Sequence, residues 1–213
     1  MMAATQTRRI LEVFRSADAE QVAKGLTWYQ VANDEALAIA RRHDITERQA
    51  AGIIAALSPQ VSWGFNLEWA NAVAAGDTTS RGFGLSLGRG LMIQRNPDVD
   101  PLDILGGPKV RAFYHAILGR GLTDAVVIDR HAYDLAEGVR GSHLSLTAKR
   151  IRVTALNYQG AARRLQETGE AIVTACQLQA ITWITWRSRY WSEGAWDGYA
   201  NDRGRAPQGE VAF

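Results

Sequence analysis

Apolar and polar residues follow one another along this chain with the period of an α-helix in nearly every segment. In residues 3–15, for example, Ile10, Leu11 and Phe14 share one helical side and arginines take the other. The strongest β candidate, Val126 to Ile128, is only a triplet. The pattern therefore predicts an all-α protein of about nine or ten helices. Besides 3–15, helices are expected at 18–24, 28–43, 47–57, 62–75, 86–95, 146–167 and 170–187, of which 18–24 and 86–95 are short.

Local signals predict where several of these helices begin and end. Thr46 and Gln49 have the spacing of a capping box, in which each side chain bonds to the backbone of the other residue. The helix that they begin, 47–57, is almost wholly apolar after its first turn, which predicts a buried, central helix. Gly25 is expected to end the helix before it, and Pro59 to end helix 47–57.

Composition argues against several classes of protein. The net charge of the 213 residues is only +2, which disfavours a histone-like nucleic-acid binder but allows a local basic face. A single cysteine, Cys176, rules out a disulfide framework and a four-cysteine metal site, and its apolar surroundings predict a buried structural thiol. We therefore expect no metal and no cofactor. Since no apolar run reaches the roughly 18 residues of a membrane span, we expect a cytoplasmic protein without a membrane partner.

Two glycines precede a lysine at residues 106–109 (GGPK). Gly106 and Gly107 would let backbone N–H groups approach a phosphate, helped by the positive end of the helix that Pro108 begins. The alternative is a plain corner in which glycine ends one helix and proline starts the next. Lys109 would contact a phosphate, act as an amine nucleophile or point into solvent, and the sequence leaves these roles open.

Asp129 lies 20 residues after Lys109, at the expected start of another helix. The simplest role of its carboxylate is that of an N-cap. Because N–H donors and the helix dipole favour the charged form, the carboxylate would also be available to stabilise a cationic sugar or to activate a nucleophile. His131 is expected to assist by hydrogen bonding, while Tyr133 and Asp134 are expected on the helix surface or a cleft wall.

Aromatic residues follow the Pro-Gln turn at the end of helix 47–57. An exposed aromatic ring such as Trp63 can stack on a base, and amides such as Gln60 and Asn66 can read base edges or fill the place of a base. The alternative places the tryptophan in the core and Gln60 on an ordinary surface. Trp183 and Trp186, near the end of the last apolar helix, are expected in the core.

Three motifs in this order resemble the helix-hairpin-helix DNA glycosylase superfamily, the endonuclease III-like enzymes. Residues 105–109 (LGGPK) resemble the hairpin L-P-G-V-G-x-K of that family. Residues 127–131 (VIDRH) resemble its apolar-Asp-x-His segment, and residues 57–60 (LSPQ) its L-S-x-Q turn. The resemblance covers residues 46–140. The hairpin is one residue shorter than in the family, and the iron–sulfur cysteines of many members are absent.

The resemblance implies a two-lobed helical fold with a helix-hairpin-helix motif and a cleft between the lobes. Residues 46–140 would form the lobe that carries the hairpin, and 1–45 with 141–187 would form the other. Residues 188–213 are rich in Gly, Asp and Arg and have no period, so they are expected to form a loosely ordered tail. Asp129 would be the catalytic carboxylate, and Lys109 the amine that forms a Schiff base. By the resemblance, Gly106 and Gly107 would hold a DNA phosphate and Gln60 would be a wedge that enters the duplex. The other expected site residues are the DNA contacts Arg111 and His131 and a base pocket of Trp63, Asn66 and Tyr133.

Three functions fit this resemblance. The first is a DNA N-glycosylase, with or without AP-lyase activity, that flips a base of double-stranded DNA into its cleft. The second is a base hypermodification transferase. The chain resembles small phage-type proteins that share SPQ-x-x-W-x-x-N, GGPK, IDRHA and QAITWITWR, and relatives of that fold are thought to attach amino acids to activated thymine, for which Asp129 would be the general base. The third is a non-catalytic DNA-binding module, which does not need Asp129. Each would work in the nucleoid or in the cytoplasm of a phage-infected cell.

Overall fold

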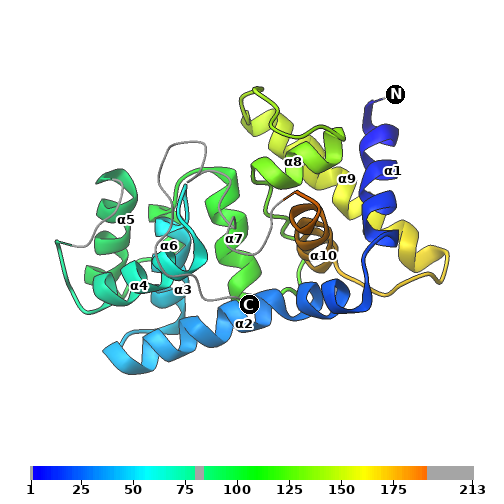
Figure 1. The fold of residues 1–213 in the computed structure, drawn as a ribbon. Coiled ribbons are helices and arrows are strands. Elements are labelled where there is room, and N and C mark those ends of the chain that lie inside the picture. The colour runs from blue at the N-terminus through cyan, green and yellow to red at the C-terminus, as the bar shows by residue number, and fades with distance from the viewer. Residues whose placement is uncertain (1, 80–83, 191–213) are drawn as a thin grey trace. The chain divides into compact units, whose positions relative to one another are not determined.

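The computed structural model describes residues 2–79 and 84–190, and over these ranges it contains helices but no strand. The predicted all-α class is therefore confirmed. Val126 to Ile128 form no regular secondary structure. They are buried, and in the chain they lie in the segment between the helix that ends at Leu118 and the helix that begins at Arg130. Most of the predicted tail, residues 191–213, lies outside the described residues. The helices, labelled in Figure 1, are α1 (Met2–Arg15), α2 (Ala19–His43), α3 (Glu47–Leu57), α4 (Trp63–Ala74), α5 (Gly84–Arg95), α6 (Pro101–Ile104), α7 (Pro108–Leu118), α8 (Arg130–Glu137), α9 (Ala148–Glu167) and α10 (Ala175–Ser188).

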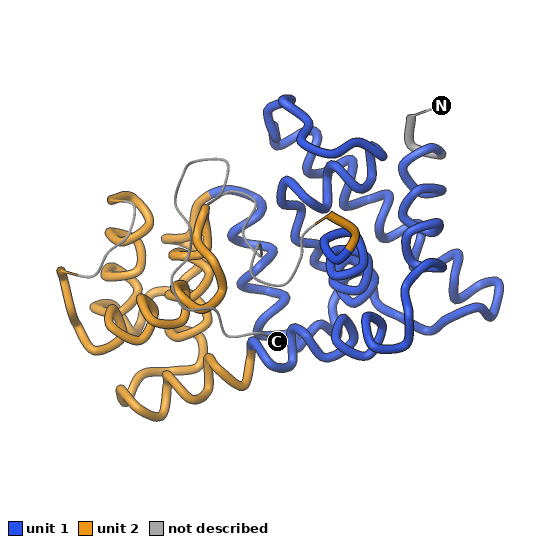
Figure 2. The backbone as a smooth tube through the Cα atoms, in the orientation of Figure 1, with its two compact units in different colours: residues 1–32, 107–188 blue, residues 33–106, 189–213 orange. Residues whose placement is uncertain are grey.

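The helices pack into two compact units, which Figure 2 distinguishes by colour. Of the described residues, 2–32 and 107–188 belong to unit 1, and 33–79, 84–106, 189 and 190 belong to unit 2. This division differs from the predicted lobes, because α7 packs against α9 while α8 packs against α1 and α10. The predicted hairpin lobe is consequently divided at Gly107, and the segment from Lys109 to Asp129 belongs to unit 1.

Unit 2 is built around α3. Every residue of this helix from Gln49 to Leu57 is buried, and α4, α5 and α6 all pack against it. The predicted capping box is present, since the Thr46 hydroxyl accepts from the Gln49 N–H and the Gln49 side chain accepts from the Thr46 N–H, both at 3.1 Å. The side-chain amide of Gln49 also donates to the carbonyl oxygen of Ile93 at 3.1 Å, which ties α5 to α3. The prediction of a central, buried helix is confirmed.

Unit 1 is built around α10, which contacts α1, α8 and α9. The helix begins at Ala175 and not at residue 170 as predicted, because Thr174 is its cap and accepts from the Gln177 N–H at 3.1 Å. Glu170 instead forms an exposed ion pair with Arg15 of α1 at 2.8 Å. The largest fully buried side chains of this unit are Ile10, Tyr114, Ile117, Ile128, Leu135, Tyr158, Leu165 and Leu178.

Gly25 does not end a helix, contrary to the prediction, and α2 continues through it. Its Cα faces α10 so closely that an added Cβ would lie 2.5 Å from the Cα of Ile181. Glycine is needed here because the two helix backbones approach each other, and this packing offsets the low helix propensity of glycine.

We predict that Gly25→Ala lowers the free energy of unfolding by about 1–3 kcal/mol, because the methyl group would push α2 and α10 apart. The matched control is Gly160→Ala in α9, where an added Cβ meets no other atom. That substitution is expected to raise the free energy of unfolding by about 0.5–1 kcal/mol. Urea denaturation followed by circular dichroism measures both changes. Equal stability of Gly25→Ala and wild type would contradict the close approach.

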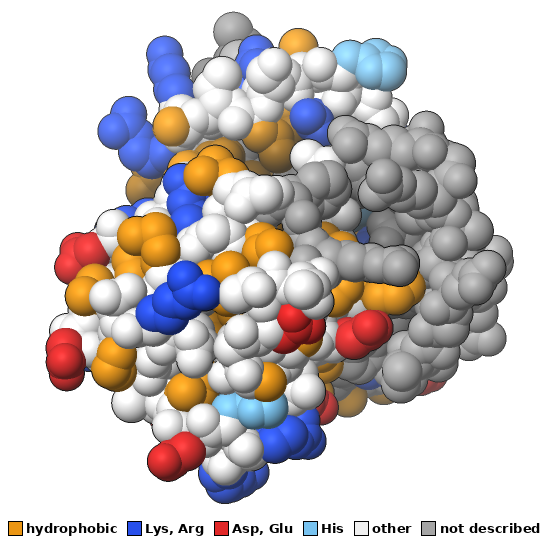
Figure 3. Space-filling view, turned by 90° about the vertical axis from the view of Figure 1, so that its left-hand side faces the viewer, with side chains coloured by type: hydrophobic (Ala, Val, Ile, Leu, Met, Phe, Trp, Pro, Cys, Tyr) orange, Lys and Arg blue, Asp and Glu red, His pale blue; other side chains and the backbone are white. Residues whose placement is uncertain are grey.

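None of the described helices is both long and apolar enough to cross a membrane. On the face shown in Figure 3, hydrophobic side chains lie in small patches between charged and neutral groups. Among the described residues of unit 2, the large exposed hydrophobic side chains are Leu85, Met92, Val99 and Tyr190.

Candidate functional site

Asp129 lies where the buried triplet ending at Ile128 meets α8, in unit 1. Its backbone is extended and its Oδ1 accepts from the Ala132 N–H at 2.8 Å, so it is the predicted N-cap of α8. Its other oxygen, Oδ2, accepts from the indole N–H of Trp183 in α10 at 2.9 Å. Each carboxylate oxygen thus has its own donor, and the residue as a whole is only half-buried.

Lys109 and His131 lie near this carboxylate within unit 1. Lys109 is half-buried in the first turn of α7, and its positive charge acts on both Asp129 and His131. His131 is in the first turn of α8, and its ring meets the ring of Trp183 at a steep angle with the centroids 6.3 Å apart. The structure therefore brings three of the predicted site residues into one electrostatic cluster, which we call the Asp129 cluster (Lys109, Asp129, His131 and Trp183).

The electrostatics of the Asp129 cluster keep the carboxylate charged. Burial alone would raise the pKa of the Asp129 carboxyl. The charge that His131 carries at the acidic pH where this carboxyl titrates, the charge of Lys109 and the two hydrogen bonds together lower the pKa further than burial raises it. The pKa of Asp129 therefore lies below its ordinary value. Burial also lowers the pKa of His131 by more than the charge of Asp129 raises it, which favours a neutral imidazole at pH 7. The cluster thus combines a carboxylate, an amine side chain and a neutral imidazole.

Aromatic rings from three helices extend the Asp129 cluster. Trp28 of α2 lies edge-on to Trp183 with centroids 6.4 Å apart, and Phe113 of α7 lies 6.0 Å from Trp28. The guanidinium of Arg187 stacks on the Trp183 ring, 4.5 Å from its centroid. Phe113 is buried, whereas Trp28 and Trp183 remain partly exposed. Aromatic surface is therefore available beside a charged carboxylate.

Trp28 and Trp183 are functional candidates that sequence analysis missed. Trp183 was expected in the core, and the structure instead places its indole N–H on Asp129, 54 residues away in the chain. The chemistry of tryptophan could have indicated this role, because an indole N–H that is removed from water normally donates to an acceptor. The sequence contains many possible acceptors, however, and the packing of α10 against α8 determines that the acceptor is Asp129.

The two hairpin glycines have different surroundings. Gly107 is the N-cap of α7, has a φ of 76°, and is exposed with no atom within 4 Å of an added Cβ. Gly106, which belongs to unit 2, lies against Arg89 so closely that any Cβ would collide with the guanidinium. Gly107 therefore keeps the open backbone that a phosphate contact requires, whereas the small size of Gly106 makes room for an arginine.

Three predicted residues, Gln60, Trp63 and Asn66, belong to unit 2 and not to the unit that holds Asp129. Gln60 is exposed and has a φ of 63°, a conformation that residues other than glycine rarely adopt. Trp63 is the half-buried first residue of α4. Asn66 is buried, and its Oδ1 has no hydrogen-bond partner among the described residues. Only Gln60 is therefore fully on the surface, as a wedge would be.

Tyr133 and Asp134 are buried, with 3% of each exposed, so the prediction that they lie on the helix surface or a cleft wall is wrong. Tyr133 is accordingly not an open wall of a base pocket. Asp134 accepts from the backbone N–H groups of Gly141 at 2.9 Å and Ser142 at 3.2 Å, and so holds the loop after α8. Arg111, a predicted DNA contact, lies on the exposed side of α7.

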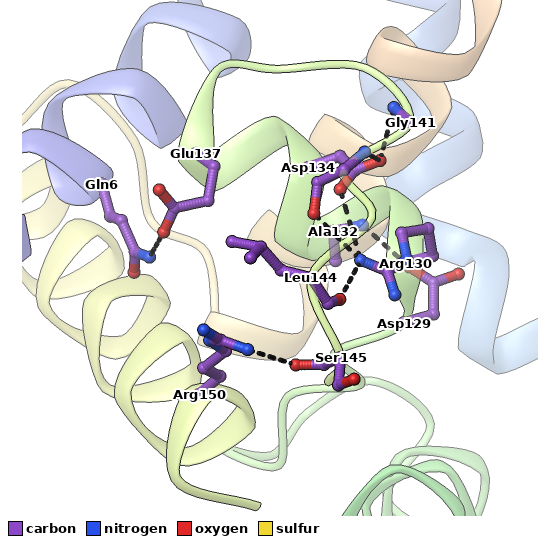
Figure 4. A network of polar contacts seen from close by, with 11 residues as sticks. Gln6, Asp129, Arg130, Ala132, Asp134, Glu137, Gly141, Leu144, Ser145 and Arg150 are labelled. Carbon is purple, nitrogen blue, oxygen red and sulfur yellow. Dashed lines mark hydrogen bonds and ion pairs between the residues drawn. The ribbon is translucent and has the colours of Figure 1, made fainter. Parts of the chain in front are cut away.

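Further polar contacts hold α8 at both ends, as Figure 4 shows. At its start, Arg130 donates to the carbonyl oxygen of Leu144 at 2.7 Å. At its end, Gln6 donates to the carboxylate of Glu137, and Arg9 donates to the carbonyl oxygen of the same residue. These contacts fix α8 against α1 and the following loop, and thereby fix the position of its N-cap, Asp129.

Metal-ligating side chains are not gathered in the part of the chain that the structure describes. No three His, Cys, Asp or Glu side chains there are placed to hold a metal ion together. Cys176 is buried in α10 as predicted, and burial raises the pKa of its thiol. The reactive groups identified at the Asp129 cluster are its carboxylate, amine and imidazole.

Comparison with known proteins gives this chain a family. Residues 1–190 match DUF7178, a family of unknown function, and the chain therefore belongs to that family. The match includes every residue that the structure describes, so both units are part of it. No curated protein and no solved structure matches the chain.

Proposed function

We propose that this DUF7178 protein is a DNA N-glycosylase that uses the Asp129 cluster as its reaction centre. One observation supports this more than any other: a half-buried carboxylate is kept charged beside a lysine and is bonded to a partly exposed indole. The three sequence motifs that resemble the helix-hairpin-helix glycosylases support DNA as the substrate, because two of them contain Lys109 and Asp129.

Asp129 suits a reaction in which positive charge develops on a sugar. When the bond between C1′ and the base breaks, its electrons leave with the base and the sugar becomes an oxocarbenium ion. The carboxylate of Asp129 would stabilise this cation electrostatically. The N–H groups of Ala132 and Trp183 already hold the carboxylate in place, so little reorganisation is needed as the charge develops.

Lys109 would supply the nucleophile of a bifunctional reaction. Its Nζ passes a proton to the Asp129 carboxylate and forms a bond to C1′, while the base leaves with the electrons of the old bond. The bond between C1′ and the ring oxygen then breaks, the ring oxygen takes up a proton from the amine, and C1′ and Nζ form a Schiff base. At this stage β-elimination can remove a C2′ proton and expel the 3′ phosphate, and water finally hydrolyses the Schiff base and frees Lys109. When water attacks C1′ instead, the product is an abasic site and Lys109 acts through its charge alone.

Trp28 and Trp183 would receive the extruded base. Stacking of a base on an aromatic side chain contributes about 1–3 kcal/mol, which offsets much of the few kcal/mol that unstacking costs. A neutral His131 beside Trp183 has one donor and one acceptor, so it can hydrogen-bond the edge of a base held there.

Duplex oligonucleotides that each carry one altered base test the proposal. The panel contains uracil, oxidised, alkylated and hydroxymethylated bases, and hot alkali reveals every abasic site. Alkali-labile sites formed by the wild-type protein would support a glycosylase. Intact strands with a heavier nucleoside would show a transferase instead, and bound but unchanged DNA would show a non-catalytic module, either of which would reject the proposal.

Trp183→Phe tests the hydrogen bond to Asp129, since it keeps an aromatic ring and removes the donor. Loss of this bond is expected to raise the pKa of the Asp129 carboxyl. As the pH falls, the variant should therefore lose its activity at a higher pH than the wild-type protein does. At pH 7 we expect a roughly ten- to hundredfold slower reaction, because a hydrogen bond to a charged group contributes about 1.5–3 kcal/mol. A pH–rate profile of the two proteins measures both effects. If the activity of both proteins falls at the same acidic pH, Trp183 does not act through Asp129.

A further inference from the structure

A groove runs between α7 and the first half of α9 in unit 1, with a volume of about 610 Å³. Pro108, the first residue of α7, lines it, so the groove lies next to Lys109 in the chain. Val126, three residues before Asp129, is also part of its lining. The small and aliphatic side chains that line it are Ala112, Ala125, Val126, Ala148, Ile151 and Ala155.

Two positively charged side chains line this groove. Lys149 and Arg152 are three residues apart on α9 and therefore lie on neighbouring positions of one helix face. Both are exposed, and neither forms an ion pair with any other residue in the described part of the chain. The single acid of the lining is Asp124, whose backbone carbonyl accepts from the side chain of Gln159 at 3.0 Å. The lining is therefore net positive.

The first turns of two helices add to this charge. Ala148 is the first residue of α9, and Pro108 is the first residue of α7, and both line the groove. The N–H groups at a helix start carry partial positive charge, which adds to that of the lysine and the arginine. At α9 one of these groups, the Arg150 N–H, already donates to the Thr147 hydroxyl at 3.3 Å. Arg150 donates to the carbonyl oxygen of Ser145 at 2.7 Å and so helps to fix the first turn of α9 beside the preceding loop.

We infer that this groove binds the phosphate backbone of the DNA strand that carries the target nucleotide. The inference rests on the proposed function and extends it. Arg152 can bind a phosphate through two N–H groups, and Lys149 adds a mobile point charge. The apolar floor suits the sugar carbons between phosphates. A strand that leaves this groove at Pro108 meets the open backbone of Gly107 and the amine of Lys109.

The double variant Lys149→Ala/Arg152→Ala tests the groove. Its matched control is Arg163→Ala/Arg164→Ala, which removes the same charge from exposed positions of the same helix, beyond the last lining residue, Gln159. Fluorescence anisotropy with a labelled duplex is measured at several KCl concentrations. For the groove variant we expect at least a roughly tenfold higher Kd at low salt and a salt slope smaller by about 2, because two phosphate contacts are lost. The control should keep the slope of wild type.

Two competition experiments identify the ligand of the groove. Inorganic phosphate at matched ionic strength should displace the duplex no better than chloride does, since a strand makes several contacts at once. RNA should compete less well than DNA, and better competition by RNA or by phosphate would overturn the inference.

The groove inference and the proposed function fail in different ways. If the groove variant binds DNA as the control variant does, while wild type forms abasic sites and Asp129→Asn does not, the groove inference is wrong and the proposed function stands. If the wild-type protein neither binds nor alters DNA, the proposed function itself is wrong. Circular dichroism melting of both double variants confirms that the comparison is made between folded proteins.

Discussion

Asp129→Asn is expected to slow the reaction by about 10²–10⁴-fold while leaving the fold intact. The substitution removes the negative charge that stabilises the cationic sugar and that accepts the proton of Lys109. It keeps the shape, since asparagine is as good an N-cap as aspartate and its side-chain oxygen can still accept one hydrogen bond. Single-turnover base release from the most reactive oligonucleotide of the panel measures the effect.

The stability of Asp129→Asn provides its control. The pKa of Asp129 is lowered in the folded protein, so its charge stabilises the fold above the pKa of the unfolded chain. That contribution is lost as the pH falls through the lower, folded pKa. Asp129→Asn should therefore be less stable than wild type at pH 7, and the difference should shrink in acid. A variant that is folded at pH 7 and still fully active would show that Asp129 is a cap and nothing more.

Lys109→Ala is expected to abolish the covalent adduct that borohydride traps between the wild-type protein and its DNA substrate. The adduct requires a primary amine that has formed a Schiff base with C1′. Lys109→Arg keeps the positive charge but cannot form this adduct, so it separates nucleophilic attack from phosphate binding. The adduct is counted as a shifted band on a denaturing gel after reduction.

Lys24→Ala is the matched control for this trapping experiment. Lys24 is exposed in α2, where it pairs with Glu20 at 2.7 Å, so its loss should leave the adduct unchanged. If Lys109→Ala traps as much DNA as wild type, another amine is the nucleophile. If no variant and no wild-type protein traps DNA although abasic sites form, water is the nucleophile and Lys109 acts through its charge.

The sequence was sufficient where structure depends on neighbours in the chain. The all-α class follows from the helical period of the apolar residues, and it is confirmed. The capping box of Thr46 and Gln49, the buried helix α3 and the N-cap role of Asp129 are also confirmed. Each of these signals lies within a few residues, so packing elsewhere does not override it. The helix-hairpin-helix assignment itself stays a prediction.

The sequence was not sufficient where distant segments meet. Gly25 was interpreted as a helix end because glycine has a low helix propensity. It lies inside α2, at a point where α10 is too close for any side chain to fit. Trp183 was interpreted as a core residue because its helix is apolar, yet it donates to Asp129. Tyr133 was expected at a cleft and is buried. In all three cases the deciding contact or burial depends on the packing of helices, which the local pattern does not contain.

The central claim is that Asp129 belongs to a site that removes a base from DNA. Mass spectrometry of nucleosides and free bases tests it most directly, with DNA from cells lacking the gene incubated with wild-type protein or with Asp129→Asn. We predict that the wild-type protein releases one free base, with matching loss of one nucleoside and a gain of abasic sites, and that Asp129→Asn releases none. Equal release by both proteins, or a heavier nucleoside without any released base, would contradict the account.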